Sequence, residues 1–131
     1  MLTLAITGFN ADPDRVTDIV GIEPTLVGRL GEPSRNGKPR AFNGWWKGVE
    51  PERLVDDRQH ADAMVRMLDH LRGRESHFAL LRKEIEPRTV TIYGGLYIQP
   101  DQQCGVFLDP DQMRILADCG VGWGLDLFVD R

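Results

Sequence analysis

One short pattern occurs twice in this chain: a strand, then Asp-Pro-Asp, then an amphipathic helix. The first copy spans residues 9–20 with Asp12 before Pro13, and the second spans 107–117 with Asp109 before Pro110. An aspartate at the helix N-cap, followed by proline at the first helical position, marks a helix start. The pattern therefore predicts two strand–helix–strand units. The repeated pattern is explained equally well by the same helix-capping chemistry used twice, without an internal duplication of the chain.

Alternating apolar and polar residues indicate the strands. The clearest alternation covers residues 89–98, and residues 2–7 show the same period. Shorter runs predict strands at 44–49, 104–108 and 124–129. In the last of these, the inward face is expected to hold Leu125, Leu127 and Val129.

Helical spacing of apolar residues indicates two more helices. Pro51 is expected to open the first, which Gly73 interrupts. Ser76 is expected to cap the second, which ends before Pro87. The predicted inward side chains are Ala61, Met64, Val65, Leu68 and Leu71 in the first helix, and Phe78, Leu81 and Ile85 in the second.

The order of these elements predicts the fold class. With 131 residues, the chain is long enough to bury a core, and we expect a single domain at 1–131. Its class is predicted to be α+β. We expect an antiparallel-dominated, mixed sheet of about five strands with the helices packed on one face.

Residues 26–44 are predicted to form a long basic loop, because their Gly, Pro, Asn and Ser content suits neither a helix nor a central strand. From Arg29 to Lys47 the chain carries five basic residues and a single acid, Glu32. The net charge of the whole chain is −4, so this segment carries +4 and the remainder −8. Such an asymmetry suits a loop that meets an acidic partner or the acidic body of its own chain.

The candidate binding residues are the cations of this segment and two adjacent tryptophans. Trp and Arg are the residue types that dominate protein–protein hot spots. Neighbouring residues of a strand face opposite ways, so one indole is expected inside, and Trp45 is assigned to the core. The candidate partner- or ligand-binding set is Arg29, Arg35, Lys38, Arg40, Trp45, Trp46 and Lys47.

Composition disfavours several classes of function. The overall acidity argues against nucleic-acid binding. No apolar run approaches the roughly 18 residues that a membrane span needs, and no signal peptide is recognised before the first strand. Cys104 and Cys119 match no metal spacing. They are expected to be reduced core thiols of a cytoplasmic protein, with a disulfide between them as the alternative.

The sequence carries no recognisable motif for catalysis, a cofactor or a metal. Helix capping explains the aspartate pairs at 12 and 14 and at 109 and 111. His60, His70 and His77 match no zinc spacing and are expected on solvated helix faces. We therefore expect no catalytic residues and no cofactor.

The landmarks, taken in order, resemble a known family. Asp-Pro-Asp and a helix lead to Gly21-Ile22-Glu23-Pro24-Thr25, then to Arg29, Gly31 and the Gly44-Trp45 pair, and finally to a strand–helix–strand. This order is similar to that of the bacterial family called domain of unknown function 4279. The resemblance spans nearly the whole chain. It implies a compact α+β domain and no particular activity.

These observations favour a non-catalytic module that binds a protein partner through the 29–47 segment. One form of it is an immunity or antitoxin-like protein that occludes another protein. If the target is a basic nuclease, the acidic helix faces, and not the basic loop, would make the contact. A homodimer is a further expectation. The alternative is a small enzyme or sensor that binds an anionic ligand under the basic loop. A weaker hypothesis is RNA stacking on one sheet face, which would carry Thr91, Tyr93, Tyr97, Phe107 and Phe128.

Overall fold

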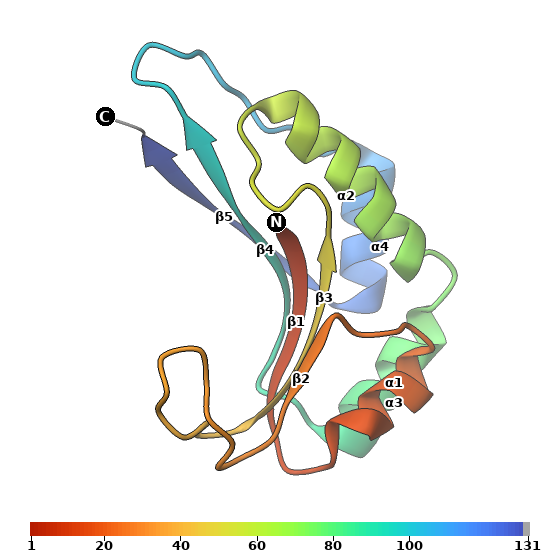
Figure 1. Ribbon diagram of the computed structural model, residues 1–131. Helices are drawn as coiled ribbons and strands as arrows, with labels where there is room; N and C mark the ends of the chain where they lie inside the picture. Colours follow the sequence, from red (N-terminus) through yellow and green to blue (C-terminus); the bar gives the residue numbers. More distant parts are fainter. Residues whose placement is uncertain (130–131) are drawn as a thin grey trace.

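The computed structural model describes residues 1–129, which form a five-stranded sheet with helices along one of its faces (Figure 1). The spatial order of the strands is β2-β3-β1-β4-β5. All neighbours are antiparallel except β4 and β5, which run parallel. The predicted α+β class with a mixed, mostly antiparallel sheet is confirmed. The strands are β1 (Leu2–Phe9), β2 (Leu26–Gly28), β3 (Asn43–Val49), β4 (Thr89–Ile98) and β5 (Gly122–Val129).

The helices begin where the sequence provides caps. Asp12 accepts a hydrogen bond from the backbone N–H of Asp14. Asp109 and Gln112 form the reciprocal capping box that their spacing predicts. The helices are α1 (Pro13–Val20), α2 (Asp57–Leu71), α3 (Glu75–Ile85) and α4 (Pro110–Cys119).

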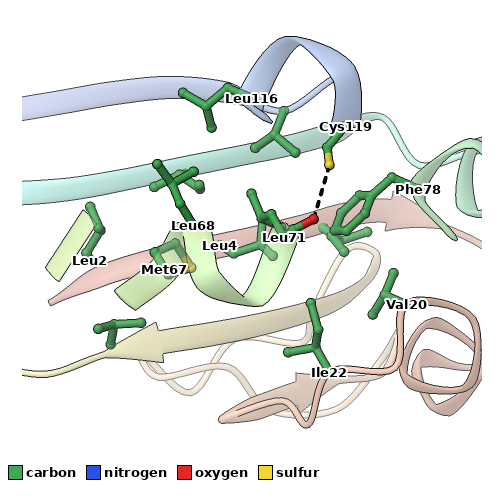
Figure 2. Close-up of a cluster of buried hydrophobic side chains, with 14 of the residues drawn as sticks. Leu2, Leu4, Val20, Ile22, Met67, Leu68, Leu71, Phe78, Leu116 and Cys119 are labelled. Carbon is green, nitrogen blue, oxygen red and sulfur yellow. Dashed lines mark hydrogen bonds between the residues drawn. The ribbon is translucent and has the colours of Figure 1, made fainter. Parts of the chain in front are cut away.

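The core lies between the helices and the central strand β1. Leu2, Leu4 and Ile6 alternate along β1, and all three are fully buried beneath the helices. Figure 2 shows Leu2 and Leu4 beside Leu68 and Leu71 of α2, with Phe78 of α3 next to them. Because β1 pairs with β3 on one side and β4 on the other, its apolar face anchors the whole core.

Two expectations for the α2 region are wrong. Pro51 does not open the helix, because residues 51–56 run beside β4 and bury Leu54, which forms a parallel bridge with Leu96. Asp56 then caps α2. The inward face is also rotated from the expected one, so Ala61 and Val65 are exposed. The residues that α2 buries are His60, Ala63, Met64, Met67, Leu68 and Leu71.

Three further expectations are corrected. Residues 104–108 form no strand; they belong to the connection that carries the chain from β4 to α4. Ser76 does not cap α3, because Arg74 holds that position and donates to the Val20 carbonyl at 2.9 Å. Leu127 and Val129 are exposed rather than inside, since β5 is an edge strand.

Candidate binding surface on the open face of the sheet

The sheet face that the helices leave uncovered has small residues at its centre. Ala5 of β1 lies opposite Trp46 on one side and Thr91 on the other. Thr3 lies between Gly48 and Tyr93 in the same way. Side chains directly opposite one another share a face. The larger aromatic side chains of β3 and β4, Trp46 and Tyr93, therefore flank the small residues of β1 on this face.

Trp46 and Arg40 form a cluster at the β3 end of this face. The Arg40 guanidinium carbon lies 5.3 Å from the centre of the Trp46 ring, within the range of a cation–π contact. The indole covers Gly44 and the Arg40 side chain covers Gly28, so that a Cβ at either glycine would overlap them. Glycine at these two positions thus lets the Arg40–Trp46 pair lie against the backbone of the sheet.

A second cluster lies at the β4–β5 end. The rings of Tyr97 and Phe128 are stacked with their centres 4.8 Å apart and their planes 16° apart. The guanidinium of Arg53 lies 3.9 Å from the centre of the Tyr97 ring. Tyr93, on the same face, is exposed. Of the aromatic residues predicted to share this face, only Phe107 is elsewhere, in the connection before α4.

The basic loop is shorter than predicted. Residues 26–28 form β2 and residues 43–44 already belong to β3, so the loop covers 29–42. Its two arms are joined by backbone hydrogen bonds from Gly31 to the Arg40 carbonyl at 2.9 Å and from Ser34 to the Lys38 carbonyl at 2.8 Å. The loop doubles back as a narrow ladder, and Figure 1 shows it on the helix-free side of the sheet.

Asn43 fastens the base of this loop, a role that sequence reasoning missed. Its side-chain oxygen accepts from the Leu30 N–H at 2.7 Å. Its amide nitrogen donates to the carbonyls of Asn10 at 3.2 Å and Ala11 at 3.0 Å. An asparagine at the end of the predicted loop, directly before the predicted strand, was the available signal, because a buried amide needs several backbone partners.

The structure separates the predicted site residues instead of gathering them. Trp45 is fully buried, as its assignment to the core required, and its Nε1 donates to Thr17 Oγ1 at 3.0 Å. Lys47 lies on the helix side of the sheet, opposite Leu4. Arg35 and Lys38 are exposed near the end of the loop. On the open face, the predicted set contributes Arg40 and Trp46.

Arg29 is engaged within the chain. Its Nε lies 3.2 Å from Asp12 Oδ2, and its Nη2 lies 3.3 Å from Asp14 Oδ2. The hydrogen bond from Arg29, together with the one from the Asp14 backbone, lowers the pKa of Asp12. Asp12 therefore serves as a helix cap and as the anchor of the loop's first residue.

A hollow of about 310 Å³ lies beneath the loop. Phe9, Leu30 and Phe42 contribute apolar walls, and Arg88 is the only cation within residues 1–129 that lines it. Arg29, Arg35 and Arg40 do not line it. The three loop arginines therefore do not converge on this hollow, as the binding of an anion beneath the loop would require.

His60 is buried, and the expectation of a solvated histidine is wrong for it. Its ring meets Trp123 edge-on with centres 6.0 Å apart. Burial lowers the pKa of His60, and its Nε2 has no hydrogen-bond partner among the described residues. It lines a second hollow of about 320 Å³ together with Asp57, Gly105 and Phe107. No three His, Cys, Asp or Glu side chains within residues 1–129 gather closely enough to hold a metal ion.

The family described as Domain of unknown function (DUF4279) matches residues 1–130. The chain belongs to this family. The resemblance to this family is therefore confirmed over essentially the whole chain. No curated protein and no solved structure matches the chain.

The landmarks shared with the DUF4279 family have structural roles in this chain. Asp12 caps α1, and Gly21 ends it with a φ of 70°, a conformation that favours glycine. Gly44 makes room for Trp46, and Trp45 fills the core. Each of these residues therefore has a structural role in α1 or β3.

The two thiols of this DUF4279 chain are free, as expected. Cys119 is buried, and its Sγ donates to the Leu71 carbonyl at 3.6 Å (Figure 2). Burial raises the pKa of Cys119, which keeps its thiol protonated. Cys104 is partly buried and packs against the core from the β4–α4 connection. Across residues 1–129, no helix is long and apolar enough to cross a membrane.

Proposed function

We propose that this DUF4279 chain is a non-catalytic protein-binding module that receives its partner on the open face of the sheet. The observation that carries the proposal is the pair of arginine–aromatic clusters on that face, Arg40 with Trp46 and Arg53 with Tyr97. Tryptophan, tyrosine and arginine supply large contact areas and charge-assisted hydrogen bonds, which is why they dominate hot spots. Small residues between the clusters leave room for an extended partner segment.

The charge of the loop favours a partner with an acidic surface. Arg29 is compensated by Asp12 and Asp14, which leaves Arg35, Lys38 and Arg40 to attract anions. An acidic protein fits this surface better than RNA does, because the remainder of the chain is strongly negative and would repel a polyanion. Asp126, on the same face as Phe128, adds to that repulsion.

The occlusion of another protein, as in immunity or antitoxin-like proteins, is one form of this function. We place the protein in the cytoplasm of a bacterium; the free thiols support a reducing compartment. The alternative of an enzyme or sensor for an anionic ligand has weaker support, because only Arg88 among the described cations lines the hollow beneath the loop.

The test compares two double variants in affinity capture from a nuclease-treated lysate of the source organism. The first, Arg40→Ala with Trp46→Ala, removes one cluster of the open face. The matched control, Leu80→Ala with Lys83→Ala, removes one apolar and one basic side chain from the exposed part of α3. Both variants must first melt cooperatively near the wild-type temperature.

We expect a protein that the wild type and the α3 control retain and that the Arg40–Trp46 variant loses. Its retention should weaken as salt is raised, because the loop charges are exposed. Equal retention by all three proteins would place the contact elsewhere and overturn the proposal. Retention that disappears on nuclease treatment would favour the RNA hypothesis instead.

A further inference from the structure

The outer edge of β5 is free along eight residues of the described sheet. β5 pairs with β4 on one side, and no strand pairs with it on the other. Natural edge strands are usually short, charged or broken by proline or a bulge, which prevents pairing with another chain. The opposite edge, β2, obeys this rule with three residues. β5 has no proline and a single charged residue, Asp126, so its edge is open to pairing.

β5 exposes large apolar side chains on both faces of the sheet. Leu127 is 61% exposed and Val129 48% exposed on the helix side, beyond the helices. On the other side, Phe128 is 46% exposed. An apolar edge strand with this exposure is expected to be covered in the working protein, because monomeric proteins rarely leave such a patch in water.

The sizes of the β5 side chains identify what can cover this edge. On the open face, Gly122 and Gly124 come first and the larger Asp126 and Phe128 follow. If a second copy of the same strand runs antiparallel, the glycines of one copy meet the large residues of the other. Aromatic side chains pack well over a glycine on the neighbouring strand. The strand is complementary to itself.

We propose that two copies of this chain pair through β5 about a two-fold axis at Leu125. The axis places Leu125 opposite Leu125 of the second copy on the helix side, with Trp123 opposite Leu127. On the open side, Gly122 lies opposite Phe128, and Gly124 lies opposite Asp126. Every large residue of the open face then meets a glycine, and the helix side of the seam is entirely apolar.

Other registers pair the two copies of β5 less favourably. An axis at Asp126 would set the two Asp126 carboxylates directly opposite each other, and like charges in that position are destabilising. An axis at Leu127 would leave only residues 125–129 to pair across it. An axis between two residues would put the helices of the two copies on opposite sides of the joined sheet, because side chains directly opposite one another share a face. The Leu125 axis alone pairs nearly the whole strand without a like-charge contact.

This pairing can be tested separately from the Arg40–Trp46 cluster of the proposed partner site, because it uses the far edge of the sheet and leaves Arg40 and Trp46 uncovered. It joins two five-stranded sheets into one, with all helices on one side. Two open faces are then presented side by side. A single partner that touches both would gain from their linkage.

The first test measures the mass of the protein in solution across a range of concentrations. We expect a dimer for the wild type. Leu127→Lys should weaken it at least about tenfold, because the lysine would face Trp123 of the second copy. Leu80→Lys, on the exposed side of α3, is the matched control and should leave the dimer intact. A wild type that stays monomeric, or a dimer equally strong in Leu127→Lys, would overturn the proposal.

The second test reads the register by cysteine cross-linking in a Cys104→Ser background. Leu125→Cys lies on the proposed axis, so two copies should form a disulfide under mild oxidation. Asp126→Cys should cross-link at least about ten times more slowly, because directly opposed residues approach within about 5 Å and offset ones do not. Faster cross-linking at residue 126 than at 125, or none at 125, would refute this pairing.

Discussion

Arg29 and Asp12 join the first residue of the basic loop to the N-cap of α1. Two of the arginine nitrogens, Nε and Nη2, donate to the two oxygens of the Asp12 carboxylate, each at 3.2 Å. The contact spans 17 residues of sequence and holds the loop against the helix start. A cation that looked available for a partner from sequence alone is thus used to position the loop.

We predict that Arg29→Gln raises the pKa of Asp12 toward its ordinary value of 3.8, because the arginine hydrogen bond is the largest cause of its lowering. The pKa of Asp12 is lower in the folded than in the unfolded chain. The pair therefore stabilises the fold above the ordinary pKa, and this contribution is lost as pH falls through the lowered value. A carboxyl titration followed by NMR measures the shift. Arg35→Gln is the control, and an unchanged Asp12 in Arg29→Gln would contradict the prediction.

The adjacent tryptophans should differ sharply in stability measurements. Trp45→Ala removes a fully buried indole and its hydrogen bond to Thr17, so it should lower the free energy of unfolding by about 3–5 kcal/mol. Trp46→Ala removes a partly buried ring on the open face and should cost less than about 2 kcal/mol. Urea unfolding of both variants provides the comparison. Similar losses for the two variants would show that the core assignment of Trp45 is wrong.

Asn43→Ala should loosen the base of the loop. It removes a bond from the Leu30 N–H and two donated bonds, and leaves their partners partly buried. We expect a loss of about 1–3 kcal/mol in the free energy of unfolding. Amide exchange at Leu30 should accelerate together with this loss. Arg35→Ala, at the exposed end of the loop, is the control and should change stability by less than about 0.5 kcal/mol.

The buried His60 should make the fold sensitive to mild acid. Burial lowers the pKa of His60 below its ordinary value of 6.5, so the unfolded chain binds a proton that the folded chain does not. The free energy of unfolding should therefore fall as pH drops below 6.5, and not above it. Burial lowers the pKa of His70 as well, so His60→Leu removes only part of the effect.

Urea unfolding at about pH 7.5 and about pH 5.5 tests this prediction. We expect the wild type to lose more stability between the two conditions than His60→Leu does. The variant should tolerate neutral pH well, because the His60 Nε2 finds no hydrogen-bond partner in the described part of the chain. An equal loss for both proteins would show that His60 is not the responsible group.

Local chemistry made some elements predictable from sequence. The alternation at 89–98 gave both ends of β4, and the Asp109–Gln112 capping box located the start of α4. In both cases the signal lies within a few residues of the structure that it specifies.

Other features depend on contacts far away in the sequence. The face that α2 buries differs from the one its apolar residues predicted. His60 and Met67 face the core, whereas Ala61 and Val65 are exposed. Leu127 and Val129 alternate like core residues, yet the helices do not cover this end of β5. Whether a strand lies at the edge or the centre of a sheet is decided by its neighbours, which its own residues do not encode.

The same limit applies to the candidate site. The composition of the 29–47 segment indicated a basic surface loop, and its tryptophans indicated a strand. The partners of Arg40 and Arg53 could not be inferred, because Gly28, Gly44 and Gly95 admit the large side chains only once the strands are in register. The position of a glycine within one strand does not show which side chain will lie over that glycine in the folded sheet.

The central place of β1 has a consequence for how the protein is made. Leu2 pairs with Val49, and Thr3 pairs with Tyr93, so the strand synthesised first acquires its second neighbour only after β4 has left the ribosome. Until then one edge of β1 is without its native hydrogen-bonded neighbour. Such long-range pairing slows folding and exposes hydrophobic surface during synthesis. We expect the nascent chain to depend on chaperones through most of its translation.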